Sequence, residues 1–297
     1  MSRVLLVTGS SRGLGRQVVA KALAAGHRVV ATARHPGQLS DFVEAYPDTV
    51  RAVALDVADA DAAAHAVRVA VDEFGRLDVV VNNAGYADLA AVEDITLDSF
   101  RAQLETNLLG VVTVTKAALP VLREQGSGHV VQVSSVGGRV ASVGLSAYQA
   151  AKWAVGGFSE VLAQEVGPLG IKVTVLEPGG MRTDWAGSSM AIPPISPPYD
   201  ATVGRAGAAD PGRRVHPGRR PGQGRGRAAA GDRHGRTAVA PAPGQRRLHL
   251  RHPRRRPARR ERPPLARPER VHRPRRRHRR GQGPVGPDER ITRHLER

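Results

Sequence analysis

The sequence of 297 residues contains no cysteine, and only 3% of its residues are aromatic. Without cysteine, neither a disulfide framework nor a thiolate metal site can form, and the redox compartment is left open. No apolar run approaches the roughly 20 residues that a membrane-spanning helix needs. The apolar stretch that begins at Val4 is too short for a signal peptide and runs directly into a glycine turn. We therefore expect a cytoplasmic protein that does not contact a membrane.

Charge and composition divide the chain near residue 205. Residues 1–204 carry a net charge of −4, whereas residues 205–297 contain 29 arginines, 7 acidic residues and no lysine, a net charge of +22. The second segment also holds 13 of the 22 prolines and no aromatic residue. Such a composition cannot bury enough apolar surface to offset the entropy lost on ordering. The sequence predicts one folded domain over 1–204 and a disordered basic tail over 205–297.

Three interpretations of the basic tail are open. An arginine-rich segment attracts nucleic-acid phosphates through counterion release, without sequence preference because aromatic residues for base stacking are absent. The tail can also be a solvated segment with no particular role. The interpretation we favour is translation out of frame in a GC-rich gene, because misread GC-rich codons yield Arg, Pro, Gly, Ala and His. The nucleotide sequence decides this: stop codons in the shifted frame beyond position 205 would exclude it.

Within the first domain, short Val- and Leu-rich runs alternate with Ala-rich segments of helical length, the pattern of buried parallel strands joined by crossover helices. This pattern predicts an α/β fold, a Rossmann-like doubly wound parallel sheet in which ligands bind at the carboxyl ends of the strands. Residues 185–204 lose the periodicity and gain Pro and Ser, as expected of a mobile loop over a pocket. The predicted strands are 3–8, 28–32, 50–55, 79–82, 129–134 and 171–176, and the predicted helices are 13–25, 59–74, 97–124 and 146–166.

A glycine-rich segment, TGSSRGLG at residues 8–15, follows the first predicted strand and precedes the first predicted helix. Glycines allow the backbone to turn tightly and approach a pyrophosphate, whose charge the helix N-terminus favours. An ordinary tight turn is the alternative. The strand before the segment, the helix after it and a second strand about twenty residues further on favour phosphate binding.

The end of the second predicted strand bears on the choice of nicotinamide cofactor. An NAD enzyme commonly places an acid there for the ribose 2′-hydroxyl, whereas the 2′-phosphate of NADP needs positive charge. Here the small residue Ala33 is followed by Arg34, and Arg12 lies in the glycine turn. Guanidinium groups bind phosphate in a bidentate manner. Either arginine can instead be a solvated surface charge, but the two together, with no acid between them, favour NADP.

Tyr148 and Lys152 are spaced so that both side chains lie on one face of a helix. A cation near a phenol favours the phenolate and lowers its pKa, so the pair suits proton transfer at a carbonyl or alcohol oxygen. Taken alone, the pair would be an ordinary helix-surface pair. Its context favours catalysis, because Ser134 and Ser135 end the fifth predicted strand shortly before this helix opens.

Together these motifs resemble those of the short-chain dehydrogenase/reductase family. The glycine turn matches the family pattern TGxxxGxG, residues 82–85 match its NNAG, Tyr148 and Lys152 match its YxxxK, and residues 178–183 match its PG loop. The resemblance implies an NADP-dependent oxidoreductase that interconverts a carbonyl and a secondary alcohol by hydride transfer. A small-molecule carbonyl or alcohol would be its substrate, and no metal is implied.

The resemblance also assigns the site residues. The implied catalytic residues are Asn107, Ser135, Tyr148 and Lys152, with Ser134 as the second candidate for the serine. The implied cofactor-binding residues are Gly9, Ser11, Arg12, Gly13, Leu14, Gly15, Arg34, Asp56, Val57, Asn83, Ala84, Gly85, Tyr148, Lys152, Pro178, Gly179, Met181 and Thr183.

Some of these positions have ordinary structural alternatives. Asp56, which would meet the adenine amino group, can instead be an acid at a helix N-terminus. Asn107, which would hold a water that relays protons through Lys152, can instead be an exposed helix residue. The apolar side chains of Trp185, Met190, Ile192 and Ile195 can line a pocket or pack the loop that carries them.

The resemblance runs from Val4 to about Gly204 and then ends. Family members continue with a further helix, a seventh strand and a segment that complete the sheet edge, the pocket and often a tetramer interface. A family-like homo-oligomer is therefore one expectation and its loss another. The second functional hypothesis is a catalytically impaired relative whose basic tail binds nucleic acid non-specifically.

Overall fold

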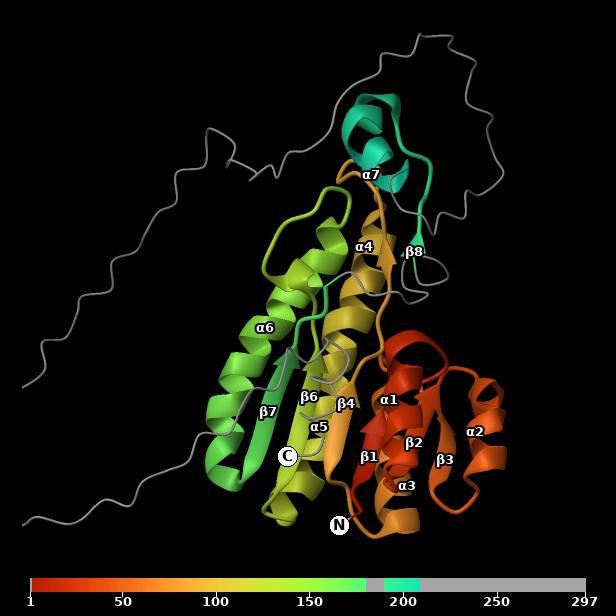
Figure 1. The fold of residues 1–297 in the computed structure, drawn as a ribbon. Coiled ribbons are helices and arrows are strands. Elements are labelled where there is room, and N and C mark those ends of the chain that lie inside the picture. The colour runs from red at the N-terminus through yellow and green to blue at the C-terminus, as the bar shows by residue number, and fades with distance from the viewer. Residues whose placement is uncertain (1, 180–189, 209–297) are drawn as a thin grey trace, which may run out of the picture. The chain divides into compact units, whose positions relative to one another are not determined.

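The computed structural model describes residues 2–179 and 190–208. Six parallel strands form the central sheet in the order β3-β2-β1-β4-β6-β7 (Figure 1). The strand order reverses between β1 and β4, which makes that point the switch of a doubly wound sheet. The predicted Rossmann-like fold is confirmed. The strands are β1 Val4–Val7, β2 Arg28–Ala33, β3 Val50–Ala54, β4 Val79–Asn82, β6 Gly128–Val133 and β7 Ile171–Leu176.

Helices cover both faces of this sheet (Figure 1). Buried side chains of α3, α5 and α6 share one apolar cluster with the strands. The crossover from β1 to β2 runs across the sheet in the opposite direction, so α1 packs on the other face. All four predicted helical regions are helical, and the structure adds a short α2 after a 3₁₀ turn at Pro36–Leu39. The helices are α1 Gly13–Ala24, α2 Ser40–Ala45, α3 Ala60–Phe74, α4 Leu97–Leu104, α5 Gly110–Glu124, α6 Ser146–Val166 and α7 Arg205–Ala208.

Local chemistry sets the ends of α3. Asp59 caps its N-terminus, since the carboxylate accepts hydrogen bonds from the backbone N–H groups of Asp61 (2.9 Å) and Ala62 (3.0 Å). At the other end Gly75 adopts a φ of 78°, a left-handed conformation that glycine tolerates best. The helix therefore begins and ends close to the predicted positions.

The predicted helix over 97–124 is interrupted by a five-residue π-helical turn at Glu105–Leu109. The backbone N–H of Gly110 bonds to the carbonyl of Glu105, five residues earlier, and the side-chain amide of Asn107 donates to the carbonyl of Gln103 (2.9 Å). A single helical period in the sequence could not reveal this change. Such turns occur frequently at functional sites.

Residues 190–208 correct two predictions. The segment predicted as a mobile loop contains a short strand, β8 Met190–Ala191, which pairs in parallel with β5 Ala87–Asp88. It continues through a 3₁₀ turn at Pro197–Tyr199 and a π-helical turn at Asp200–Gly204. Residues 205–208, predicted to begin the disordered tail, form α7. The rest of the predicted tail lies outside the described residues.

Side-chain bonds and apolar packing order this segment. The hydroxyl of Tyr199 donates to the carboxylate of Glu93 (2.6 Å), and the backbone N–H of Ser196 donates to Asp94 (3.0 Å). Met190, Ile192 and Ile195 pack against a buried cluster that includes Leu89 and Val203. We refer to residues 190–208, with β5, as the cap.

None of the helices placed by the structure combines the length and the apolar character needed to cross a bilayer.

Candidate active site

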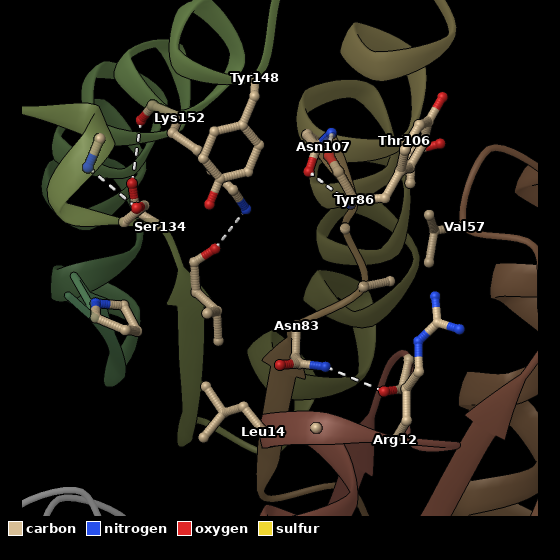
Figure 2. Close-up of a pocket in the computed structure, with 18 of the residues that line it drawn as sticks. Arg12, Leu14, Val57, Asn83, Tyr86, Thr106, Asn107, Ser134, Tyr148 and Lys152 are labelled. Atoms are coloured by element: carbon tan, nitrogen blue, oxygen red, sulfur yellow. Dashed lines mark hydrogen bonds between the residues drawn. The ribbon is translucent and has the colours of Figure 1, made fainter. Parts of the chain in front are cut away.

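A cavity of about 610 Å³ opens at the carboxyl ends of the sheet strands (Figure 2). It lies where a doubly wound sheet is expected to bind its ligand. Predicted site residues that line it are Gly9, Ser11, Arg12, Gly13, Leu14, Arg34, Asp56, Val57, Asn83, Ala84, Gly85, Asn107, Ser134, Ser135, Tyr148, Lys152, Pro178 and Gly179. Gly15 lies beneath the cavity wall, and Met181 and Thr183 lie outside the described residues.

The glycine turn between β1 and α1 depends on glycine at three positions. Gly9 and Gly13 adopt φ angles of 66° and 55°, where side chains with a Cβ are strained. A Cβ at Gly15 would overlap the carbonyl oxygen of Gly9 and the side-chain amide of Asn83. Gly15 therefore lets the helix pack closely against the turn, while Gly9 and Gly13 face the cavity.

Thr8 and Asn83 brace the turn against the end of β4. The hydroxyl oxygen of Thr8 accepts from the backbone N–H groups of Asn83 (2.9 Å) and Ala84 (3.0 Å). In return, the side-chain amide of Asn83 donates to the carbonyls of Thr8 (2.9 Å) and Gly9 (3.2 Å). Figure 2 shows Asn83 facing the turn beside Arg12 and Leu14. These bonds hold the two predicted cofactor motifs in a fixed relation.

Two arginines line the same cavity, Arg12 from the turn and Arg34 after β2, with Ala33 beside them. Figure 2 shows the guanidinium of Arg12 directed toward Val57. Within residues 2–179 and 190–208, neither arginine forms an ion pair with a carboxylate. Arg16, by contrast, pairs with Asp41 and stacks over a phenyl ring, so it is already engaged.

The structure separates the two roles considered for Asp56. The N-terminal cap of α3 is Asp59. The carboxylate of Asp56 accepts from the backbone N–H of Ala58 (3.1 Å), and the residue lines the cavity next to Val57. Asp56 therefore lines the cavity and does not cap α3, and its contact with adenine stays a prediction.

Tyr148 and Lys152 lie in the first two turns of α6 and are 6% and 3% exposed. The Lys152 ammonium donates to the carbonyl of Val133 (2.8 Å) and lies 5.7 Å from the centre of the Tyr148 ring (Figure 2). Burial lowers the pKa of Lys152 to about 8. The predicted pair therefore shares one helix face in the cavity.

The pKa of Tyr148 is shifted overall in the direction opposite to the one expected from a nearby cation. Burial raises the pKa of Tyr148 above its usual value, because the phenolate would lose its solvation, and a hydrogen bond with Ser135 opposes this only in part. The phenol consequently favours its protonated form, which is the acid required for carbonyl reduction.

The two serines that end β6 have different environments. The hydroxyl oxygen of Ser135 accepts from the backbone N–H of Gly137 (3.0 Å), and Ser135 also hydrogen-bonds to Tyr148. Ser134 is 3% exposed and donates to the backbone carbonyl of Lys152 (3.1 Å). Ser135 thus lies beside the phenol, as the first assignment expected, and Ser134 joins the strand to the helix.

Asn107 is fully buried, so the alternative of an exposed helix residue is wrong. Its side-chain amide donates to the carbonyl of Tyr86 (2.8 Å), and its oxygen accepts from the N–H of the same residue (3.3 Å). A Cβ on Gly85 would lie 2.6 Å from that oxygen and 3.6 Å from the Lys152 ammonium. The π-helical turn therefore carries Asn107 to the neighbourhood of the lysine.

Tyr86 and Gln149 are among the polar side chains that line the cavity and that the sequence analysis missed. Each directly follows a recognised motif, Tyr86 after the NNAG and Gln149 after the tyrosine of YxxxK. Burial and the nearby carboxylate of Asp88 raise the pKa of Tyr86, and Arg34 opposes them. Adjacency to a motif was the signal that could have identified both.

The structure also decides between the two roles considered for the apolar residues of the cap. Met190, Ile192 and Ile195 pack into the cluster around Leu89 and do not line the cavity. They therefore hold the cap together. Trp185 lies outside the described residues.

Comparison with known proteins assigns the chain to a family. The family description "short chain dehydrogenase" matches residues 3–191, and the chain belongs to this family. An oxidoreductase of Botryotinia fuckeliana, Oxidoreductase BOA17, is 60% identical over 205 residues, which cover 69% of this chain and 75% of the relative. The chain is therefore an oxidoreductase of the short-chain dehydrogenase type.

Two solved structures resemble the fold. A short-chain dehydrogenase from Streptomyces avermitilis is 42% identical, with a TM-score of 0.66 over 69% of this chain and 76% of the other. A short chain dehydrogenase/reductase from Burkholderia phymatum in complex with NAD has a TM-score of 0.60 over 62% of this chain and 68% of the other. At 24% identity, the second supports the fold alone.

Proposed function

We propose that this protein is an NADP-dependent oxidoreductase that interconverts a carbonyl and a secondary alcohol, with Tyr148 as the acid and base. The observation that carries this proposal is the pairing of two hydroxyl groups, those of Ser135 and Tyr148, on the wall of the cavity, with Lys152 buried beside them. Such a pair can hold a carbonyl oxygen and protonate it.

The cavity suits a dinucleotide. Gly9 and Gly13 line the cavity without side chains, and the N-terminus of α1 follows at once. The glycine turn would hold the pyrophosphate, Asp56 the adenine, and residues 83–85 the adjoining ribose. Pro178 and Gly179 line the cavity after β7, where the nicotinamide end belongs.

Arg12 and Arg34 favour NADP over NAD. Both line the cavity after β1 and β2, and Ala33 stands where an acid would meet the 2′-hydroxyl. Two guanidinium groups that have no carboxylate partner in the described part of the chain suit a phosphate dianion. A phosphate there would satisfy both cations, whereas a bare hydroxyl would satisfy neither.

In the direction of reduction, residues of this chain deliver one proton to the carbonyl oxygen of the substrate. Ser135 accepts from the N–H of Gly137, so its own proton, which bonds to Tyr148 before substrate binds, can turn to hold the substrate oxygen. Tyr148, whose raised pKa keeps it protonated, donates its proton to that oxygen. Lys152, with Asn107 nearby, would return a proton to the phenol through water. The bound nicotinamide supplies the hydride to the carbonyl carbon.

The test is a titration of the full chain with NADPH and NADH, followed by reduction of a panel of aldehydes and ketones. We expect NADPH to bind at least about tenfold more tightly than NADH, because each guanidinium–phosphate bond contributes about 1.5–3 kcal/mol. Carbonyl reduction should follow for part of the panel. Failure of both cofactors to bind would overturn the proposal, and a preference for NADH would overturn its NADP component.

The charge of +22 over residues 205–297 supports a second candidate, non-specific binding of nucleic acid by this segment. Mobility-shift assays at low and high salt, with and without these residues, test it. Binding that weakens steeply with salt and needs the segment supports this candidate, and equal behaviour of both chains contradicts it.

For the enzyme itself we propose a cytoplasmic location and a small-molecule substrate.

A further inference from the structure

Gln149 lies directly after Tyr148 on α6 and is only 7% exposed. Both ends of its side-chain amide are used. The oxygen accepts from the backbone N–H of Ser142 (2.8 Å), and the nitrogen donates to the backbone carbonyl of Val140 (3.0 Å). These two hydrogen bonds, which we call the clasp, hold residues 140–142 in the connection between β6 and α6.

The same side chain lies against the turn that carries Ser135. A Cβ on Gly137 would be 3.2 Å from the Gln149 amide nitrogen and 3.3 Å from the Ser135 hydroxyl oxygen. The buried amide of Gln149 is thus packed between the turn that carries Ser135 and residues 140–142. Gln149 itself directly follows Tyr148 in the sequence. The backbone N–H of Gly137, in turn, orients the Ser135 hydroxyl.

The clasped segment has little packing of its own. Residues 139–143 are all exposed, with Val140 and Val143 at 52% and 54%. Gly144 then turns with a φ of 83°, and its carbonyl accepts from the N–H of Ala90 in the cap connection (2.9 Å). Apolar burial does not hold residues 139–143. Backbone bonds to the carbonyl of Val136 and an ion pair between Arg139 and Glu177 hold the start of this segment, and the two bonds of Gln149 hold residues 140 and 142 against α6.

This segment reaches the cavity through Ser142. Ser142 and Leu145 line the cavity with Val136 and Gln149, on the α6 side of Tyr148. The arginines and the glycine turn line it from β1 and β2. Leu145 also packs on the cap cluster, so residues 140–145 connect the phenol to the cap.

We propose that Gln149 is a positioning residue that holds residues 140–142 as the wall against which the carbonyl substrate is oriented. It acts through that segment and does not touch the reacting atoms. The proposal rests on the proposed function. It predicts that loss of the clasp weakens substrate binding while cofactor binding and the proton transfer at Tyr148 stay nearly intact.

Two variants separate the bonds. Gln149→Met keeps the size of the side chain and removes both bonds, whereas Gln149→Glu keeps the acceptor for the Ser142 N–H and loses the donor to Val140. A net contribution of about 1 kcal/mol for each bond gives roughly a fivefold rise in KM for the glutamate and up to about thirtyfold for the methionine. The matched control is Gln164→Met, on the same helix, where the exposed amide bonds to the backbone carbonyl of Glu160.

The closing experiment measures KM and kcat for the carbonyl substrate, the dissociation constant of NADPH and backbone hydrogen exchange in all three variants and the parent. We expect KM to rise in Gln149→Glu and to rise further in Gln149→Met. In both variants kcat and NADPH affinity should stay within about twofold of the parent. The Ser142 N–H should exchange faster in Gln149→Met, and the control should match the parent throughout.

Unchanged KM together with unchanged exchange at Ser142 would overturn the inference. A fall in melting temperature or kcat without a change in KM would overturn it too. That pattern is expected if the Gln149 amide only stabilises the fold and does not position the substrate. Exchange needs no turnover, so the two failures are distinguishable: if the parent binds no nicotinamide cofactor, the proposed function fails while the exchange measurement still tests the clasp.

Discussion

The ammonium nitrogen of Lys152 is bonded to the carbonyl of Val133 at 2.8 Å and lies 5.7 Å from the centre of the Tyr148 ring. The lysine is therefore anchored to β6, and the phenol is held by burial and by Ser135. The two groups are neighbours on α6, and residues at the end of β6 bond to both of them. Their protonation states follow from burial more than from each other.

This relationship predicts the pH dependence of the free enzyme. Burial lowers the pKa of Lys152 to about 8, so the ammonium is present below that pH and is lost above it. The profile of kcat/KM for NADPH, which reports groups of the free enzyme, should be high below pH 8 and fall as pH rises through about 8. Lys152→Met should show a lower value without this alkaline fall. A fall that persists in the variant would assign it to another group.

The serines predict contrasting phenotypes. Ser135→Ala removes a hydroxyl that lies beside the phenol, so kcat/KM for the carbonyl should fall by about 10²-fold or more with little change in melting temperature. Ser134→Ala removes a buried bond to the Lys152 carbonyl, which should cost about 1 kcal/mol of stability and leave most of the activity. Steady-state kinetics and denaturant unfolding measure both. The opposite pattern would reverse the assignment.

The arginines predict cofactor selectivity. Arg12→Ala and Arg34→Ala should each weaken NADPH binding by roughly ten- to a hundredfold and leave NADH binding nearly unchanged, because only the 2′-phosphate needs the charge. Arg16→Ala is the matched control, since this arginine pairs with Asp41 at the surface. Fluorescence titration measures all three. Equal losses for both cofactors would show that the arginines bind something other than the 2′-phosphate.

The glycine turn predicts a steric phenotype. Gly15→Ala places a methyl group against the Gly9 carbonyl and the Asn83 amide, so it should destabilise the fold by about 1–3 kcal/mol and disrupt cofactor binding. Gly37→Ala, where a Cβ would meet nothing within 4 Å, should leave both properties nearly unchanged. Chemical denaturation and NADPH titration are the readouts. Tight NADPH binding by Gly15→Ala would mean that the turn can relax.

The sheet and its helices could be predicted because their signals are local. Each strand of the sheet is a short apolar run between residues that interrupt strands. Asp59 and Gly75 mark the start and the end of α3 in the sequence. The glycine turn and the spacing of Tyr148 and Lys152 are equally local. The structure brings these motifs to one cavity because parallel strands present their carboxyl ends at the same edge.

What could not be predicted depends on tertiary contacts. The π-helical turn follows from how Asn107 meets Tyr86, and β8 exists only because β5, about a hundred residues earlier, offers a partner. The order of residues 190–208 was missed because Pro and Ser were given more weight than the apolar side chains among them. The protonation of Tyr148 was misjudged because burial, which dominates its pKa, is invisible in the sequence.

The most direct test compares kcat and the NADPH dissociation constant for Tyr148→Phe and the parent chain. The substitution removes one hydroxyl and keeps the buried ring. We expect NADPH affinity within about twofold of the parent and a fall in kcat of about 10²- to 10⁴-fold, the contribution typical of a positioned proton donor. Turnover within a few-fold of the parent would contradict the assignment of proton transfer to Tyr148.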